Sequence, residues 1–532
     1  MQLLILISVF VALIGRQPAS GSPNARLAAL LTLLSSVGAA LVCVAVNLLV
    51  ARQIDRRGQL NRGRYRRALM LLGWAILGLF ATQVFVLHWP AGPAAALEFL
   101  HASDWPLLGE LLTWLPFLAM LLAYWASAYP VDARLRALDL QRRLESALPV
   151  YSVGPAGRGV WTLWQFLAFQ VRFHMLFILL PLTGVLLAEL IITWAFGPHG
   201  LGPWLQSLNL PQGSQDKLMI SVVLAAFVAV LVLSPPVLVR LFSNSPLPAG
   251  PLLDKLHAVM HRLGGAAGGE ANSRVRKIVL WNTHGMVSNA AVMGLWRRLR
   301  YVMLTDALVE TLADEQIEGV FSHEFGHVIH HHIFYYMLLM ISMSTCGEFL
   351  AGRAVRLPAL RAFAHHWSIQ PDVIFGAMFA AIGVAILLAF GWISRRFEWQ
   401  ADLVGAQGIV VGELANSPFM PIAKVPSPKP SPGGGGEESA ATRNGEDDPL
   451  AFPPTVAAAE IYASGLFRIA DLNGLDRRQR TWRHGSIDQR AVHLCRLSRP
   501  ADFARFRRTI LLTKLAILLL ALAAAMVFAT GA

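Results

Sequence analysis

The stretch His323-Glu324-Phe325-Gly326-His327 has the pattern H-E-x-x-H on a segment predicted to be helical. Residues four positions apart lie on one face of a helix, so both imidazoles can reach the same metal ion. The glutamate between them can then act as a base toward a water molecule. The stretch therefore predicts a hydrolytic zinc site and directs attention to the rest of the ligand set.

A catalytic zinc site needs three protein ligands and one open position. A third histidine on the same helix would have to stand at position 333, which is Ile333. Glu348 is a second candidate, but it lies near the far end of the next apolar segment, roughly 30 Å away along a continuous helix. We favour Glu398, because Asp402 follows one helical turn later and could accept the outer N–H of a ligand histidine. The alternative for this pair is a solvated acidic face.

Three further histidines, His330, His331 and His332, follow the pattern directly. Such a run resembles a metal-binding tract. It also stands where the helix is expected to enter the membrane interface, and we therefore predict interface packing or water contacts for it rather than a second metal site.

The composition excludes an ordinary soluble protein. The chain has 532 residues, 55% of them hydrophobic and 14% charged, with a mean hydropathy of +0.51. These values predict a polytopic membrane protein. The predicted spans are 27–50, 68–88, 107–128, 173–196, 218–242, 333–350, 373–394 and 510–530. The shorter run 2–14 is read either as a first span or as a signal peptide, although no basic residue precedes it.

The net charge of +13 suggests a nucleic-acid partner, but the positions of the arginines argue against one. They concentrate in loops between spans, whereas the loops 89–106 and 197–216 carry no Lys or Arg. The first two basic clusters are Arg52, Arg56, Arg57, Arg62, Arg64, Arg66 and Arg67, then Arg134, Arg136, Arg142 and Arg143. This alternation follows the positive-inside rule and indicates a lipid bilayer as the partner. The three cysteines have no paired spacing, so neither a disulfide framework nor a zinc knuckle is expected.

Alternation of the loops places segments 51–67, 129–172, 243–332 and 395–509 on the cytoplasmic side. Both metal-ligand fragments then lie on that side, since spans 333–350 and 373–394 form a hairpin. The arginines of loop 351–372 depart mildly from the pattern. An active site at the cytoplasmic face, in a bacterial inner membrane, is the expected location.

The predicted organisation has five parts. Residues 1–242 form a membrane region with about six spans, and 243–332 form the first half of a catalytic domain. That half is predicted to contain strand-like runs at 275–281 and 300–305 and a short edge strand within 289–294. A helix follows, which begins at an N-cap at Asp314 and continues into the next span. The remaining parts are a transmembrane hairpin at 333–394, the second half of the catalytic domain at 395–509, and a C-terminal span at 510–530. Residues 416–455 are rich in Pro, Gly and acidic residues and are predicted to be a disordered insertion.

The chain resembles the membrane-integrated zinc metallopeptidases that include the CaaX prenyl proteases and the HtpX heat-shock proteases. The matching stretches are Ser288-Asn289-Ala290, Leu304-Thr305-Asp306-Ala307-Leu308, His323 to His327, Glu398-Trp399-Gln400-Ala401-Asp402, and Arg483-His484-Gly485-Ser486 with Arg490. The resemblance covers roughly 275–332 and 393–495. It implies a mainly α polytopic membrane protein that carries a gluzincin-like α+β metallopeptidase domain.

The resemblance implies that His323, His327 and Glu398 bind one Zn²⁺ ion per chain. Glu324 would be the general base and then the proton donor to the leaving amine. Asp402 would support a ligand histidine from behind.

The resemblance also implies residues that handle the substrate. The Asn289-Ala290 strand would pair with an extended peptide. His484 and Arg490 would hold the substrate carbonyl or stabilise the oxyanion, the alternative for both being an ordinary surface position. Gly485 stands where many members of the family have proline.

These features predict a zinc-dependent membrane endopeptidase that acts on membrane proteins or lipid-linked peptides. Two substrate classes remain open, namely misfolded membrane proteins and one defined, CaaX-like substrate. A non-catalytic scaffold is a third possibility, although the ligands and the base are all present. A transporter is disfavoured, because the spans contain few ionisable residues.

Overall fold

The computed structural model describes most of the chain, namely residues 1–14, 25–57, 62–99, 106–145, 161–176, 202–207, 212–242, 244–264, 275–283, 287–367, 371–411 and 449–530, with Gly285 and scattered positions between 179 and 200. The chain divides into two compact units, Met1–Leu190 and Ile191–Ala532, and each is described on its own. Of the predicted insertion 416–455, only residues 449–455 lie within the described ranges.

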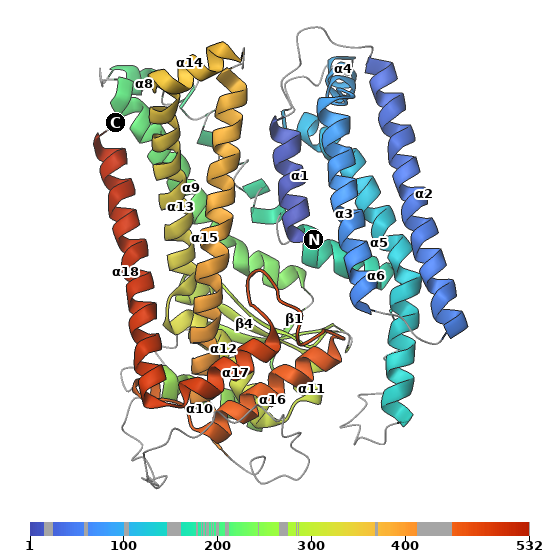
Figure 1. Ribbon diagram of the computed structural model, residues 1–532, viewed down its shortest axis with the longest axis vertical. Helices are drawn as coiled ribbons and strands as arrows, with labels where there is room; N and C mark the ends of the chain where they lie inside the picture. Colours follow the sequence, from blue (N-terminus) through green and yellow to red (C-terminus); the bar gives the residue numbers. More distant parts are fainter. Residues whose placement is uncertain are drawn as a thin grey trace. The chain divides into compact units, whose positions relative to one another are not determined.

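The first unit is helical. Its long helices α2, α3 and α5 run side by side (Figure 1). The elements of this unit are α1 (Gln2–Ile14), α2 (Ala25–Arg57), α3 (Arg62–Phe85), α4 (Ala91–Phe99), α5 (Pro106–Glu145), α6 (Leu163–Gln170) and the π-helix η1 (Val171–Leu176).

Polar side chains join the helices of the first unit. The Tyr65 hydroxyl donates to Asn47 Oδ1 at 2.7 Å, and Asn47 Nδ2 in turn donates to the Ser127 hydroxyl at 3.1 Å, which links α3, α2 and α5. Trp114 Nε1 donates to the Ser8 hydroxyl at 2.9 Å, so α1 is anchored to α5. In a lipid bilayer the hydrophobic effect does not drive helices together, because lipid tails are as apolar as the side chains. Hydrogen bonds between helices therefore contribute to their association. The segment 2–14 is thus a helix packed within this bundle.

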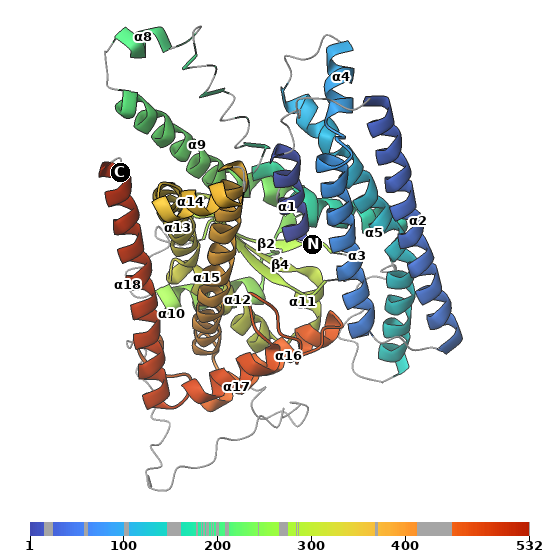
Figure 2. The ribbon, with the colours of Figure 1, turned by 45° about the horizontal axis from the view of Figure 1, so that its top comes forward.

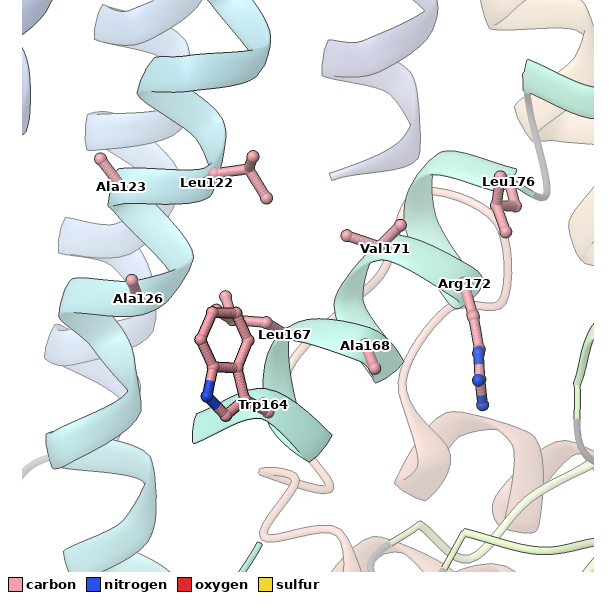
Figure 3. Close-up of a pocket in the computed structure, with 9 residues that line it drawn as sticks. All are labelled: Leu122, Ala123, Ala126, Trp164, Leu167, Ala168, Val171, Arg172 and Leu176. Carbon is pink, nitrogen blue, oxygen red and sulfur yellow. The ribbon is translucent and has the colours of Figure 1, made fainter. Parts of the chain in front are cut away.

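An apolar pocket of about 600 Å³ lies within the first unit, between α5 and the α6–η1 segment. Figure 3 shows Leu122, Ala123 and Ala126 on its α5 wall, with Trp164 and Arg172 on the other. Arg172 is its one charged lining residue, and none of the predicted site residues lines it.

The second unit combines a small sheet with long helices. Figure 2 shows the sheet beside α12. The sheet order is β1-β2-β4-β3, in which β2 and β4 are parallel and the two outer pairings are antiparallel. Its strands are β1 (Asn244–Pro246), β2 (Lys277–Trp281), β3 (Ala290–Met293) and β4 (Tyr301–Thr305). Every residue of β4 is buried, as expected for a central strand rich in β-branched and large apolar residues.

The helices of the second unit surround that sheet and extend away from it. In Figure 1, α13, α15 and α18 are three long helices, and α16 and α17 lie at the end where the sheet is. The helical elements are α8 (Gly202–Ser207), α9 (Gln212–Leu241), α10 (Pro251–Gly264), η3 (Arg297–Leu299), α11 (Asp306–Thr311), α12 (Asp314–Ile329), α13 (His332–Val355), α14 (Pro358–His366), α15 (Pro371–Gln407), η5 (Pro449–Ala451), α16 (Val456–Leu472), α17 (Ile487–Leu497) and α18 (Pro500–Thr530).

Within the part of the chain that the structure describes, seven helices are long and apolar enough to cross a membrane, which confirms a polytopic, mainly α protein. They correspond to seven of the eight predicted spans. They are Ala25–Arg56, Gly63–Phe85, Leu111–Leu138, Ser221–Leu241, His332–Val355, Ala380–Gln407 and Pro500–Thr530. The predicted span 173–196 falls partly outside the described residues.

Two details of the predicted metal-binding helix are wrong. Ala313, not Asp314, is its N-cap, and the Ala313 N–H donates to Gln316 Oε1 at 3.2 Å. Asp314 is the first helical residue, and its carboxylate pairs instead with Lys255 at 2.6 Å.

The second correction is at the other end of the helix. It does not continue into the membrane span, because His331 adopts a left-handed conformation with φ of 55°. A non-glycine residue in this region interrupts the regular hydrogen-bond ladder, and α13 begins anew at His332.

Close packing of α12, α15 and α16 forms the centre of the second unit. The phenol ring of Tyr462, on α16, is fully buried against two glycines. A Cβ on Gly405 would lie 2.7 Å from Tyr462 Cε2 and 3.1 Å from the Gly319 carbonyl oxygen. Glycine is therefore needed there for α15 to approach both other helices.

We expect Gly405→Ala to lower the free energy of unfolding by about 1–3 kcal/mol, the usual effect of overpacking a core. The measurement is thermal unfolding of the purified full chain in detergent. Gly383→Ala, on the same helix, is the matched control, because a Cβ there meets nothing within 4 Å. Equal unfolding temperatures for the two variants would contradict the packing argument.

Candidate metal centre

Helix α12 presents both predicted histidine ligands on one face. The Nε2 atoms of His323 and His327 lie 3.3 Å apart. Gly326, between them in the pattern, faces α15, and a Cβ there would lie 3.0 Å from Val404 Cβ and 3.3 Å from Ala401 Cα. The glycine thus allows α15 to pass directly against the turn of helix that carries the ligands.

Helix α15 brings Glu398 to the same point. Its Oε2 lies 3.7 Å from His323 Nε2, and its Oε1 lies 3.7 Å from His327 Nε2. Zinc ligands about 2.0 Å from the ion at tetrahedral angles are about 3.3 Å apart. The three groups therefore fit one small cation, and among the described residues they form the one such group of His, Cys, Asp and Glu.

A buried network holds His323 from behind. Its Nδ1 lies 3.0 Å from Asp402 Oδ1 and 2.9 Å from the Tyr462 hydroxyl, which itself donates to Asp402 at 2.8 Å. The carboxylate accepts the Nδ1–H, so the Nε2 lone pair of His323 faces the metal position. Tyr462 was not identified from the sequence, because it is one apolar-flanked tyrosine in a distant helix.

Arg490, on α17, holds the other side of Asp402. Its Nε donates to Oδ2 at 2.9 Å and its Nη2 to Oδ1 at 2.5 Å, a bidentate pair. The same Nη2 lies 4.0 Å from Glu398 Oε2. The Arg490 side chain is only 11% exposed, so water screens its charge little, and the charge acts mainly on Asp402, its bidentate partner.

Contacts of His327 run to residues beyond the predicted set. Its Nδ1 lies 2.8 Å from Nδ1 of His332, and Nε2 of His332 lies 3.0 Å from the side-chain oxygen of Gln400. His332 is fully buried. The expectation of interface packing or water contacts is therefore wrong for His332, because the break after α12 turns this residue back toward the metal ligands.

Glu324 lies beside the edge of the sheet. One of its carboxylate oxygens accepts a hydrogen bond from the Val292 backbone N–H at 2.9 Å, so the predicted base is fixed against strand β3. Burial raises the pKa of the Glu324 carboxyl, and the charge of Glu398 adds to that rise.

The two ligand histidines have opposite electrostatic tendencies. Burial lowers the pKa of His327 to about 4. Burial also acts to lower the pKa of His323, but its hydrogen bond to Asp402 and the two carboxylate charges prevail and raise it. The surroundings of His323 thus stabilise positive charge on its ring, and equally a cation bound to it.

A tight turn carries His484 to the cluster. Its Nδ1 lies 2.8 Å from Glu398 Oε2, and its side chain is 42% exposed. Trp482 packs directly over Gly391, where a Cβ would lie within 3 Å of its ring nitrogen and force a shift. Arg395 donates to the Trp482 carbonyl at 2.9 Å, so α15 positions the turn. Gly485 has a φ of 73°, which a proline at this position could not adopt.

Strand β3, which contains Ala290 and follows Asn289, is an edge of the sheet. The Asn289 carbonyl accepts from the Thr305 N–H at 3.0 Å, so its backbone faces β4. Antiparallel strands alternate the direction of their polar groups, so Ala290 and Val292 point their N–H and C=O groups outward. The Val292 N–H bond to Glu324 agrees with this alternation.

The sequence comparisons agree with this geometry. Residues 254–433 match the model of Peptidase family M48. The chain is 30% identical over 159 residues to the Protease HtpX of Legionella pneumophila, covering 29% of this chain and 54% of the relative. It is 31% identical over 128 residues to a Protease HtpX homolog of Bacteroides fragilis, covering 22% and 38%. The chain thus spans about half or less of the length of the curated relatives it matches.

The crystal structure of S. mikatae Ste24p aligns over 88% of this chain and 98% of its own, with 14% identity and a TM-score of 0.31. That score is too low to establish a common arrangement of helices.

The molecule is an integral membrane protein that contains a metal-site helix and a small mixed sheet. Its residues 254–433 are similar to Peptidase family M48, and the curated relatives that share about 30% identity with parts of the chain are HtpX proteases.

The Asp402–Arg490 pair can be tested by a double-mutant cycle. Arg490→Met leaves a buried carboxylate without its partner, and we expect it to lower the free energy of unfolding by roughly 3–5 kcal/mol. Asp402→Asn in the same chain should recover a large part of that loss.

The measurement is unfolding of the four cycle members in detergent. Arg478→Met is the matched control, because its side chain is 91% exposed and its loss should change the free energy by at most about 0.5 kcal/mol. Strictly additive effects at Asp402 and Arg490 would contradict the coupling.

Proposed function

We propose that this protein is a membrane-bound zinc endopeptidase in which His323, His327 and Glu398 hold the metal and Glu324 is the general base. The observation that carries the proposal is the convergence of the three candidate ligand atoms, all within 4.8 Å of one another, beside the half-buried Glu324. The M48 match and the HtpX relatives support the same activity. When bound, zinc would polarise the scissile carbonyl and make water a strong nucleophile near neutral pH.

Glu324 moves the proton in this mechanism. Its carboxylate takes a proton from the attacking water as the oxygen bonds to the carbonyl carbon, and it delivers that proton to the amine nitrogen as the C–N bond breaks. Burial raises its pKa above the ordinary value of a glutamate, which suits a group that must both accept and release a proton. The adjacent Val292 N–H keeps the carboxylate oriented.

The remaining predicted residues orient the substrate and the ligands. Ala290 offers outward-facing backbone groups at the edge of the sheet, next to the base, where an extended peptide can add as a further strand. His484, partly exposed and beside Glu398, is suited to donate to the developing oxyanion. Arg490 acts mainly through Asp402, since its Nε and Nη2 atoms both donate hydrogen bonds to that carboxylate.

The membrane helices determine which substrates can reach the site. His327 lies next to the start of the α13 span, and Glu398 lies in the last part of α15. We therefore infer cleavage close to the bilayer surface, of membrane proteins or lipid-linked peptides. The arginine-rich loops support a cytoplasmic site, and the bacterial relatives support a bacterial inner membrane.

Replacing the base separates chemistry from metal binding. We expect Glu324→Gln to keep near-stoichiometric zinc and to reduce cleavage of casein or an unfolded membrane protein by roughly 10²–10⁴-fold. Metal content and cleavage are measured on the purified full chain in detergent. Glu315→Gln, on the first turn of the same helix, is the matched control and should retain activity.

Absence of zinc from both the wild type and the Gln variant would disprove the metallopeptidase. Undiminished cleavage by Glu324→Gln would disprove the role of the base. Zinc without cleavage of either substrate by the wild type would favour a defined, CaaX-like lipidated peptide over general quality control.

A further inference from the structure

The two ligand histidines are supported in different ways. Behind His323 stands a carboxylate, Asp402. Behind His327 stands a second imidazole, that of His332, followed by the amide of Gln400. The second arrangement contains no acidic group and is formed by residues from the start of α13 and from α15.

Gln400 sets the direction of both hydrogen bonds that link it to His332 and His332 to His327. The Gln400 side-chain oxygen can only accept, so Nε2 of His332 carries the proton and donates to it. The opposite nitrogen of a neutral imidazole is then an acceptor. Nδ1 of His332 therefore accepts from Nδ1–H of His327, and the lone pair of His327 is left on Nε2. That is the atom that faces Glu398 and His323.

The position of His332 is rigidly defined. Its side chain is fully buried, and its ring stacks on Phe397 with centroids 4.3 Å apart and planes 4° from parallel. Lys514 from α18 donates to the backbone carbonyl of His330 at 3.1 Å. This bond holds the backbone in place at the helix break that precedes His332. Both ring nitrogens of His332 are already engaged, so it is not available as a ligand of another ion.

We propose that His332 and Gln400 form a positioning relay that holds His327 in the tautomer required to bind the metal. The relay deepens the proposed zinc site and rests on it. Because both members are neutral, it fixes the ring of His327 without adding negative charge. Asp402 already supplies one carboxylate to the other histidine.

Gln400 offers the sharpest test, because Met and Glu are both similar in size to Gln, but only Glu keeps a hydrogen-bond acceptor at that position, together with an added negative charge. Gln400→Met removes the acceptor, whereas Gln400→Glu keeps it. We expect the zinc dissociation constant of Gln400→Met to rise roughly 10–100-fold, as for other lost partners of ligand histidines. Gln400→Glu should bind zinc at least as tightly as the wild type.

The dissociation constant is measured by chelator competition on the purified full chain in detergent, and the Co²⁺ absorption spectrum reports the ligand geometry. His332→Leu should weaken zinc binding as Gln400→Met does. The exposed neighbour His331→Asn is the control and should bind like the wild type, since asparagine tolerates the left-handed backbone there. If His332→Leu does not fold, the Gln400 pair still decides.

Equal zinc affinity for the wild type and Gln400→Met would overturn the relay. Equal weakening in Gln400→Glu and Gln400→Met would also overturn it, since packing and not hydrogen bonding would then be responsible. Either result would leave the proposed metallopeptidase standing. A wild-type chain that binds no zinc would overturn both proposals.

Discussion

The close approach of α12 and α15 is the constraint on which the site depends. Each helix carries part of the ligand set, and the parts meet only if the two backbones come together with almost no side chain between them. Gly326 on α12 and Gly405 on α15 provide that contact, one against Val404 and the other against Tyr462 and the Gly319 carbonyl. Because protein interiors are densely packed, one added methyl group at either glycine would push the helices apart and displace the candidate ligands.

Charge compensation explains which side chains surround Glu398 and Asp402. Glu398 and Asp402 are both buried, and each isolated carboxylate would be costly to remove from water. Arg490 neutralises Asp402 through two hydrogen bonds. Glu398 instead faces the Nε2 atoms of His323 and His327 and the Nδ1 atom of His484. The remaining negative charge is suited to a cation at the ligand position. The supporting residues thus set the shape of the candidate site, and they would also set its affinity for a metal ion.

Much of this arrangement could be predicted from local patterns. Spacing of one helical turn identified His323 with His327, and Glu398 with Asp402. Apolar runs identified seven spans that match long apolar helices among the described residues. Tyr462 could not be found this way, because its role arises from α16 crossing two helices far away in the sequence. His332 was visible in the sequence, but its contact depends on the left-handed turn at His331. A local pattern predicts what one helix presents, not where an interruption directs the next residue.

The interruption at His331 links the metal centre to the membrane. A continuous helix would carry His332 around the axis and away from His327, since neighbouring faces recur only every three to four residues. The break instead lets α13 start in a new direction, enter a membrane span, and leave its first residue beneath a metal ligand. Helix α15 returns from the same hairpin with both Glu398 and Gln400 in its last turns. The hairpin therefore supplies one of the three candidate ligands and both residues of the proposed relay, so the geometry of the candidate metal site depends on how α13 and α15 pack against each other.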